Sequence, residues 1–83
     1  MEKSIICAVN TLIKEADRTL TEYSLQMEKE VLSMVKSASA LIWNNANPNT
    51  EEFLIYWITD IECSFVERIT KLHREQIKQY LSE

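Results

Sequence analysis

Apolar residues recur every three or four positions through the first half of the chain, with polar and charged residues between them. This spacing is typical of an amphipathic α-helix that buries one stripe of its surface. Residues 3–43 contain neither Gly nor Pro, so the pattern predicts one long helix over about residues 3–44. Its apolar stripe consists of Ile5, Val9, Leu12, Ala16, Leu20, Tyr23, Met27, Val31, Met34, Ala38 and Leu41.

One stretch of this predicted helix, residues 15–24, has weaker helical character. Thr19 and Glu22 have the spacing of a capping box, and Thr21 is β-branched. A break near residues 17–21 is therefore the alternative, and it would produce a three-helix bundle. We favour a continuous helix because no Gly is present to end a helix there.

The sequence NNANPN, residues 44–49, is the loop-like stretch of the chain. Asn47 followed by Pro48 suits the N-cap and first position of a new helix, while Thr50, or Asn49 with Glu52, offers a later start. The second helix is predicted over about residues 49–81. Its stripe consists of Leu54, Ile58, Ile61, Phe65, Ile69, Leu72, then Gln76 or Ile77, and Tyr80.

These elements predict an all-α fold with a single helical domain over residues 1–83. The two long helices would form an antiparallel helical hairpin, folded at residues 44–49. A hairpin of two helices lacks a closed core, and four helices would supply one. We therefore expect either that two hairpins assemble into a four-helix bundle, or that one hairpin docks on another protein.

The hairpin would leave apolar residues uncovered in two places. The run FLIYWI, residues 53–58, is apolar around the whole helix, whereas one neighbouring helix covers only part of that circumference. Residues 1–11 have no facing residue in the hairpin. Since a contiguous exposed apolar patch marks an interface, the predicted partner-binding residues are Phe53, Ile55, Tyr56, Trp57, Ile5, Ile6 and Val9.

Composition weighs against several other classes of protein. The formal net charge of −4 disfavours binding to nucleic acid or to an anionic membrane surface. The longest apolar run, Phe53–Ile58, is far shorter than the ~18 residues of a membrane span. The apolar N-terminal stretch is interrupted by Asn10 and has no cleavage site of an export signal, so we expect a cytoplasmic protein.

The residues needed for catalysis or metal binding are scarce. The chain has one His, two Cys and no Gly, which excludes a Gly-rich phosphate loop and gives no metal-ligand cluster. Nothing around His73 suggests a nucleophile with an orienting group. Cys7 and Cys63 are expected to be buried free thiols. We therefore expect no enzyme activity, no cofactor, no metal and no small-molecule substrate.

Two features of the sequence lead to alternative functions. With Trp43 before the loop and Phe53 and Trp57 after it, the chain resembles the WXG100 proteins, which implies a secreted helical hairpin; the turn here reads Trp43-Asn44-Asn45, without the family's Gly. A basic strip on the second helix admits a dimeric helical transcription regulator, although Glu67 and Glu75 interrupt it. This strip consists of Arg68, Lys71, Arg74 and Lys78.

The main expectation is a non-enzymatic protein–protein interaction module. Such a small acidic helical protein would act as an adaptor, chaperone, inhibitor or regulator, by binding a protein partner, by forming a homodimer, or both. The sequence does not choose among these roles, because a fold of this kind hosts many functions.

Overall fold

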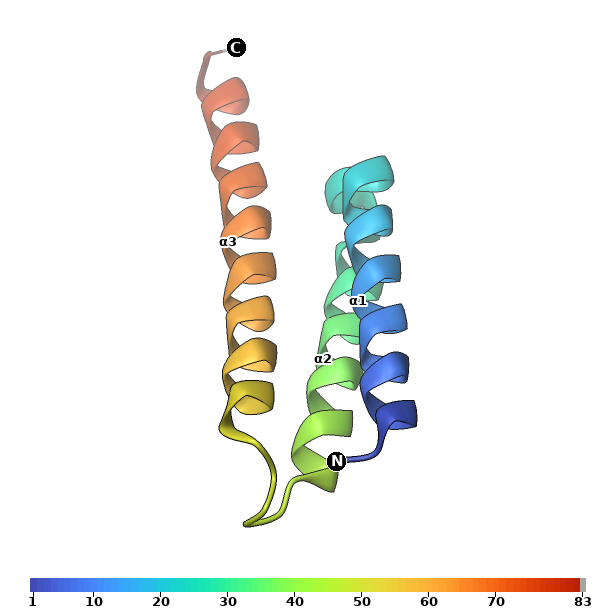
Figure 1. Cartoon of the computed structure of the whole chain (residues 1–83). Helices are drawn as coiled ribbons and strands as arrows, with labels where there is room; N and C mark the ends of the chain where they lie inside the picture. Colours follow the sequence, from blue (N-terminus) through green and yellow to red (C-terminus); the bar gives the residue numbers. More distant parts are fainter. Residues whose placement is uncertain (83) are drawn as a thin grey trace.

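The structure, a computed structural model that describes residues 1–82, consists of three helices (Figure 1). Helix α1 spans Lys3–Tyr23, α2 spans Glu28–Asn45 and α3 spans Glu52–Ser82, and a short 3₁₀ turn, η1, occupies Ser24–Met27. The first two helices run antiparallel, and α3 runs antiparallel to α2 (Figure 1). The predicted all-α class is confirmed, and the described residues contain no strand.

The predicted continuous helix over residues 3–44 is wrong, because the chain reverses direction at η1. Ser24 ends α1 with φ 53° and ψ −138°, while its N–H donates to the carbonyl oxygen of Leu20. A non-Gly residue in this region costs about 1–3 kcal/mol. Folding back buries Val9, Ala16 and Leu20, and a fully buried Val or Leu side chain contributes about 1.5–3 kcal/mol. The burial therefore outweighs the strain, and no Gly is required.

The reversal also lies beyond the alternative break at residues 17–21. Thr19 is inside α1 and is buried, so the capping box that Thr19 and Glu22 suggested does not start a helix. The antiparallel hairpin at the predicted loop is present, but it joins α2 to α3. Helix α1 folds back against this hairpin, so that three helices surround one core.

The core follows the apolar stripes of all three helices and contains two clusters. In the cluster near the loop, Val9 of α1 packs with residues of α2 and α3; in the second, Ala16 and Leu20 pack with the two other helices. The buried residues contributed by α2 and α3 are Val31, Val35, Ala38, Ile42, Leu54, Ile58, Phe65 and Ile69. Each helix thus has one buried stripe, as the spacing predicts.

A tight turn, not a helix start, accounts for Asn47 and Pro48. The N–H of Thr50 donates to the carbonyl oxygen of Asn47 at 2.9 Å, and the N–H of Asn49 donates to Asn47 Oδ1 at 2.8 Å. Pro presets the backbone angle of the second turn position, and Asn in the first position accepts from the backbone two residues on. Helix α3 consequently begins at Glu52, three residues later than predicted.

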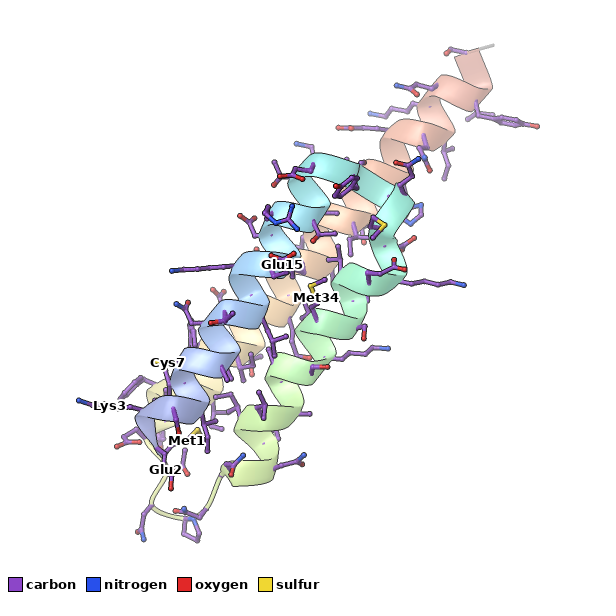
Figure 2. All side chains as sticks on the ribbon, turned by 90° about the vertical axis from the view of Figure 1, so that its right-hand side faces the viewer. Met1, Glu2, Lys3, Cys7, Glu15 and Met34 are labelled. Carbon is purple, nitrogen blue, oxygen red and sulfur yellow. The ribbon has the colours of Figure 1, made fainter. Side chains whose placement is uncertain are left out.

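Helix α3 extends well beyond the other two helices at its C-terminal end (Figures 1 and 2). His73 is level with the start of α2, where its Nε2 lies 3.0 Å from Glu28 Oε1. Residues 74–82 are all exposed and add roughly 13 Å of single helix, at 1.5 Å per residue. The prediction that residues 1–11 have no facing residue is wrong, because Met1 and Ile5 pack against the core cluster near the loop.

Candidate interaction surface

The start of α3 carries the apolar run that the sequence singled out. Leu54 and Ile58 face the core and are buried. Ile55 and Trp57 are partly buried and pack against the edge of the same cluster. Phe53 and Tyr56 point outward and remain 67% and 71% exposed. The fold therefore covers part of the run and leaves two aromatic side chains in solvent.

Trp43, in the last turn of α2, joins these residues at the loop end of the molecule. Its side chain is 54% exposed, and with Ile55 and Tyr56 it lines an open hollow of about 410 Å³. The remaining lining residues are Ala46, Asn47, Thr50 and Glu52. We define the loop-end surface as Trp43, Phe53, Ile55, Tyr56 and Trp57.

Trp43 is not among the partner-binding residues predicted from the sequence. Its place became apparent only once the loop returned α3 beside α2. The signal available in the sequence was its position immediately before NNANPN, because a hairpin brings the residues on either side of its loop together. Phe53 and Tyr56 could be predicted as surface residues from the sequence alone, because six consecutive apolar positions cannot all face one core.

Acidic and amide side chains surround the loop-end surface. Glu51 and Glu52 are exposed at the start of α3, and the N-terminal ammonium of Met1 lies 3.9 Å from a Glu51 carboxylate oxygen. The loop itself contributes uncharged Asn47 and Asn49. Large aromatic groups beside adaptable amides are the combination that many protein-binding surfaces use.

The predicted N-terminal patch is mostly covered by the fold. Val9 is completely buried in the core cluster near the loop, so its side chain is not available to a partner. Ile5 and Ile6 are partly buried, because α1 lies along the α2–α3 hairpin and does not project from it. These three residues do not form a second exposed patch.

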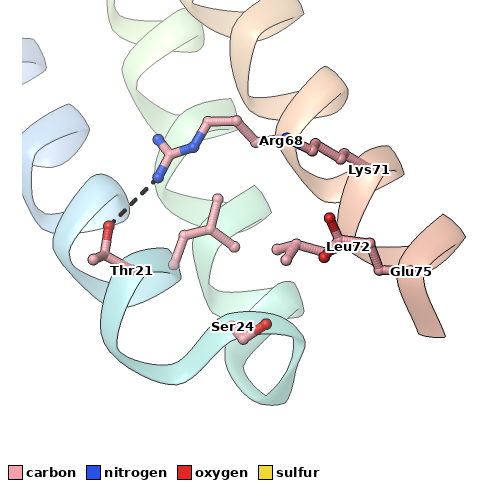
Figure 3. Close-up of a pocket in the computed structure, with 7 residues that line it drawn as sticks. Thr21, Ser24, Arg68, Lys71, Leu72 and Glu75 are labelled. Carbon is pink, nitrogen blue, oxygen red and sulfur yellow. Dashed lines mark hydrogen bonds between the residues drawn. The ribbon is translucent and has the colours of Figure 1, made fainter. Parts of the chain in front are cut away.

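A groove between α1 and α3 contains the first residue of the basic strip (Figure 3). Arg68 donates to Asp17 at 2.7 Å and to Thr21 at 3.5 Å, and its guanidinium carbon lies 5.1 Å from the centre of the Phe65 ring. These contacts join α3 to α1 and occupy the guanidinium group. The groove, of about 320 Å³, is lined by Leu20, Thr21, Ser24, Arg68, Lys71, Leu72 and Glu75.

Charged side chains also stabilise the outer face of α1. Arg18 donates hydrogen bonds to Glu15 and, at 2.8 Å, to Glu22. The hydrogen bond from Arg18 lowers the pKa of Glu15 below its ordinary value, and both glutamates raise the pKa of Arg18. The group is exposed, so we assign it to local support of the helix.

In the part of the chain that the structure describes, the cysteines and the possible metal ligands do not form a common site. Cys7 and Cys63 are free and exposed, which corrects the expectation of buried thiols; both lie on faces that turn away from the core. Within residues 1–82, no three or more His, Cys, Asp or Glu side chains gather as a metal site would require. None of the helices over these residues combines the length and apolar character needed to cross a bilayer.

Comparison with known proteins adds no relative. No family model matches the chain, and neither a curated protein nor a solved structure matches it. The tripeptide behind the WXG100 resemblance is not a turn in this structure, because α2 continues through Trp43 and Asn44 to Asn45.

Proposed function

We propose that this chain is a non-enzymatic protein–protein interaction module, a small acidic helical adaptor or inhibitor that binds a protein partner through the loop-end surface. The observation that carries the proposal is the exposure of Trp43, Phe53 and Tyr56 at one end of the molecule. Single exposed apolar residues are ordinary, but three large exposed aromatic residues at one end of a molecule are typical of an interface, and two of them, Trp43 and Tyr56, line the hollow.

The size of these side chains supports their role as anchors. An aromatic side chain buries roughly 150–250 Å² when fully covered, and these three are each more than half exposed. A partner that covers them removes on the order of 300–400 Å² of mostly apolar surface from water. At about 25 cal/mol per Å² this gives ~8–10 kcal/mol, before the cost of association is subtracted. The aromatic side chains alone can thus offset much of that cost.

The surrounding charges indicate the chemistry of the partner. Glu51 and Glu52 are exposed beside the hollow, and charges at the rim of an interface select complementary partners. We therefore expect an apolar segment flanked by Lys or Arg. Binding should weaken as salt rises, because exposed charges are screened within about 10 Å at 0.1 M salt.

Site-specific photo-crosslinking in the native cell tests the proposal. A benzophenone amino acid replaces Tyr56 in one strain and Asn10, an exposed residue of α1, in a matched control strain. The proposal predicts a discrete covalent adduct with a protein from position 56 that is absent from position 10. The same adducts from both positions, or none from position 56, would contradict it.

Affinity measurements with the captured partner then test the anchors. Phe53→Ala combined with Tyr56→Ala should raise Kd by at least ~30-fold, because central aromatic anchors contribute about 2 kcal/mol or more. Tyr23→Ala is the control, since Tyr23 is an exposed aromatic residue outside the loop-end surface and outside α3, and is the last residue of α1, at the end of that helix away from the loop. A double variant with unchanged Kd and unchanged helical circular dichroism would refute the assignment.

Self-association remains part of the proposal, but it needs another surface. The predicted four-helix assembly used the outer face of residues 53–58 together with the N-terminal patch. Leu54, Ile58 and Val9 are all inside the core of one chain, so little of that surface is left. The exposed apolar residues farther along α3 are the remaining candidates for contact with a second copy.

A further inference from the structure

We propose that two copies of this chain pair through the exposed flank of α3 beside α2, where His73 contacts Glu28, in antiparallel orientation. The proposal concerns a different surface from the loop-end surface and does not depend on it. It starts from a row of exposed residues that we call the α3 stripe, which consists of Cys63, Val66, Thr70, His73, Ile77 and Tyr80.

The α3 stripe has the spacing of a helix–helix contact. Its steps alternate between three and four residues, the repeat with which two helices pack along a common seam. All six side chains are exposed, and Val66, Ile77 and Tyr80 are each more than half exposed. None is Asp, Glu, Lys or Arg. Six positions of a solvated helix face in a chain with 27% charged residues would be expected to contain one or two.

The length of α3 provides a second observation. Residues 74–82 project past α1 and α2 (Figures 1 and 2) and carry exposed Ile77, Tyr80 and Leu81. An unsupported helical segment this short is marginal in water, because helices gain most of their stability from packing. A partner helix beside the projecting segment would supply that packing.

A second copy of the chain supplies this packing when the two α3 helices lie in one particular register. When α3 is placed antiparallel to itself with Thr70 beside His73 of the second copy, Val66 lies beside Ile77 and Cys63 beside Tyr80. Each contact occurs twice, as two-fold symmetry requires. The projecting segment of each copy, residues 74–82, then lies along residues 61–69 of the other. Apolar residues therefore meet apolar residues, and both projecting segments are covered.

Charges beside the α3 stripe select this orientation over a parallel one. In the antiparallel register Glu67 lies beside Arg74 of the second copy, and the pair is formed twice. In a parallel pairing each stripe residue faces its own copy, and Glu62 lies beside Glu67 of the second copy, again twice. Flanking charges of this kind set the orientation of paired helices. The parallel arrangement thus has two repulsive contacts where the antiparallel one has two attractive contacts.

A second copy is favoured over another protein because one face supplies both members of every contact. In this register the α3 stripe of one copy faces residues 63–80 of the other, and Tyr56 of the loop-end surface lies outside that span. The loop-end surface consequently stays free in the dimer, and the dimer would present two such surfaces. Loss of dimerisation and loss of partner binding can therefore be measured separately.

Charge exchange tests the register in the full chain. The monomer–dimer Kd is measured by sedimentation equilibrium for Glu67→Arg, for Arg74→Glu and for the double exchange. Each single variant creates two repulsive contacts and should raise Kd roughly 5–30-fold, whereas the double variant should return Kd to within about threefold of wild type. Glu75→Arg changes the charge equally outside the α3 stripe and serves as the control.

Three results would overturn the proposal. The first is a wild-type protein that stays monomeric at every concentration. The second is a double variant that dimerises no better than the single variants while its circular dichroism shows intact helix. The third is an equal effect of Glu67→Arg and Glu75→Arg on Kd, since only Glu67 lies beside the α3 stripe.

Cross-linking separates the two orientations directly. In a Cys7→Ser background the protein has Cys63 alone, and two copies of Cys63 lie about 25 Å apart in the antiparallel dimer, at 1.5 Å per residue. A short bismaleimide should then give no covalent dimer. Adding Tyr80→Cys places a thiol beside Cys63 of the second copy and should give efficient covalent dimer. Cross-linking through Cys63 alone would show a parallel pair and would refute the antiparallel register.

Discussion

Replacing Ser24 by Gly should stabilise the protein, although Gly weakens most helical proteins. Ser24 has a φ of 53° and a ψ of −138°, a region that is nearly restricted to Gly, and its Cβ costs about 1–3 kcal/mol there. Gly removes this strain, but it adds about 0.5–1 kcal/mol of unfolded-chain entropy. The difference raises the free energy of unfolding by roughly 1 kcal/mol, which corresponds to ~4–8 °C in Tm for a domain of this size.

Urea unfolding at a fixed protein concentration, followed by helical circular dichroism, measures this gain. Ser24→Ala is the matched control, because it removes the hydroxyl and keeps the Cβ; we expect it to change stability by less than about 0.5 kcal/mol. An uninterrupted helix through residue 24 requires the opposite order, with Ala stabilising and Gly destabilising by about 1 kcal/mol relative to Ala. A Gly variant less stable than the Ala variant would therefore refute the reversal at η1.

Three further predictions concern the core, the surface charges and the contact between α1 and α3. Ile58 is fully buried, so Ile58→Ala should lower the free energy of unfolding by about 2–5 kcal/mol in the same assay; a loss below 1 kcal/mol would place it outside the core. The lowered pKa of Glu15 means that its contribution to stability is present above the pKa of the unfolded state and lost as pH falls through the folded pKa. NMR titration of the Glu15 carboxyl should show this pKa rise towards its ordinary value in Arg18→Ala, and an unchanged pKa would refute the assigned cause. A double-mutant cycle on Asp17, which is exposed, and Arg68, which is partly exposed, should give a coupling below about 1 kcal/mol; a much larger coupling would contradict a solvated ion pair.

The helical faces could be predicted from the sequence because burial follows helical periodicity. Val9, Ala16 and Leu20 were assigned to one stripe, and all three are buried. In α2 the predicted Val31 and Ala38 are buried, whereas Val35 and Ile42 are buried in place of their predicted neighbours Met34 and Leu41. The shift arises because α2 faces both α1 and α3, and its buried face is the one between them.

The reversal at residues 24–27 could not be predicted in the same way. The apolar steps of three and four continue through Leu20, Tyr23, Met27 and Val31, so the periodicity contains no interruption at the turn. Ser24 carries no turn signal of the kind that Gly, Pro or Asn provides. What decides the fold is the burial gained across the whole length of α1, which is a tertiary effect that local propensity does not contain.

The loop-end surface could be predicted in part from the sequence. Six consecutive apolar residues had to leave some side chains outside any core, and Phe53 and Tyr56 are those residues. Val9 was assigned to the surface only because the first helix was taken as continuous. The exposed row on α3 depends on knowing which side of α3 faces α1 and α2, and that became clear only with all three helices in place.

The proposed self-association rests on the claim that the α3 stripe, which the three-helix fold leaves exposed, pairs two copies of the chain. The most direct test is sedimentation equilibrium of the wild-type chain over a wide concentration series. The account predicts a concentration-dependent rise from the monomer mass of 9.7 kDa to twice that value, without larger species. A mass that remains at 9.7 kDa up to the highest concentration, or one that rises without limit, would contradict it.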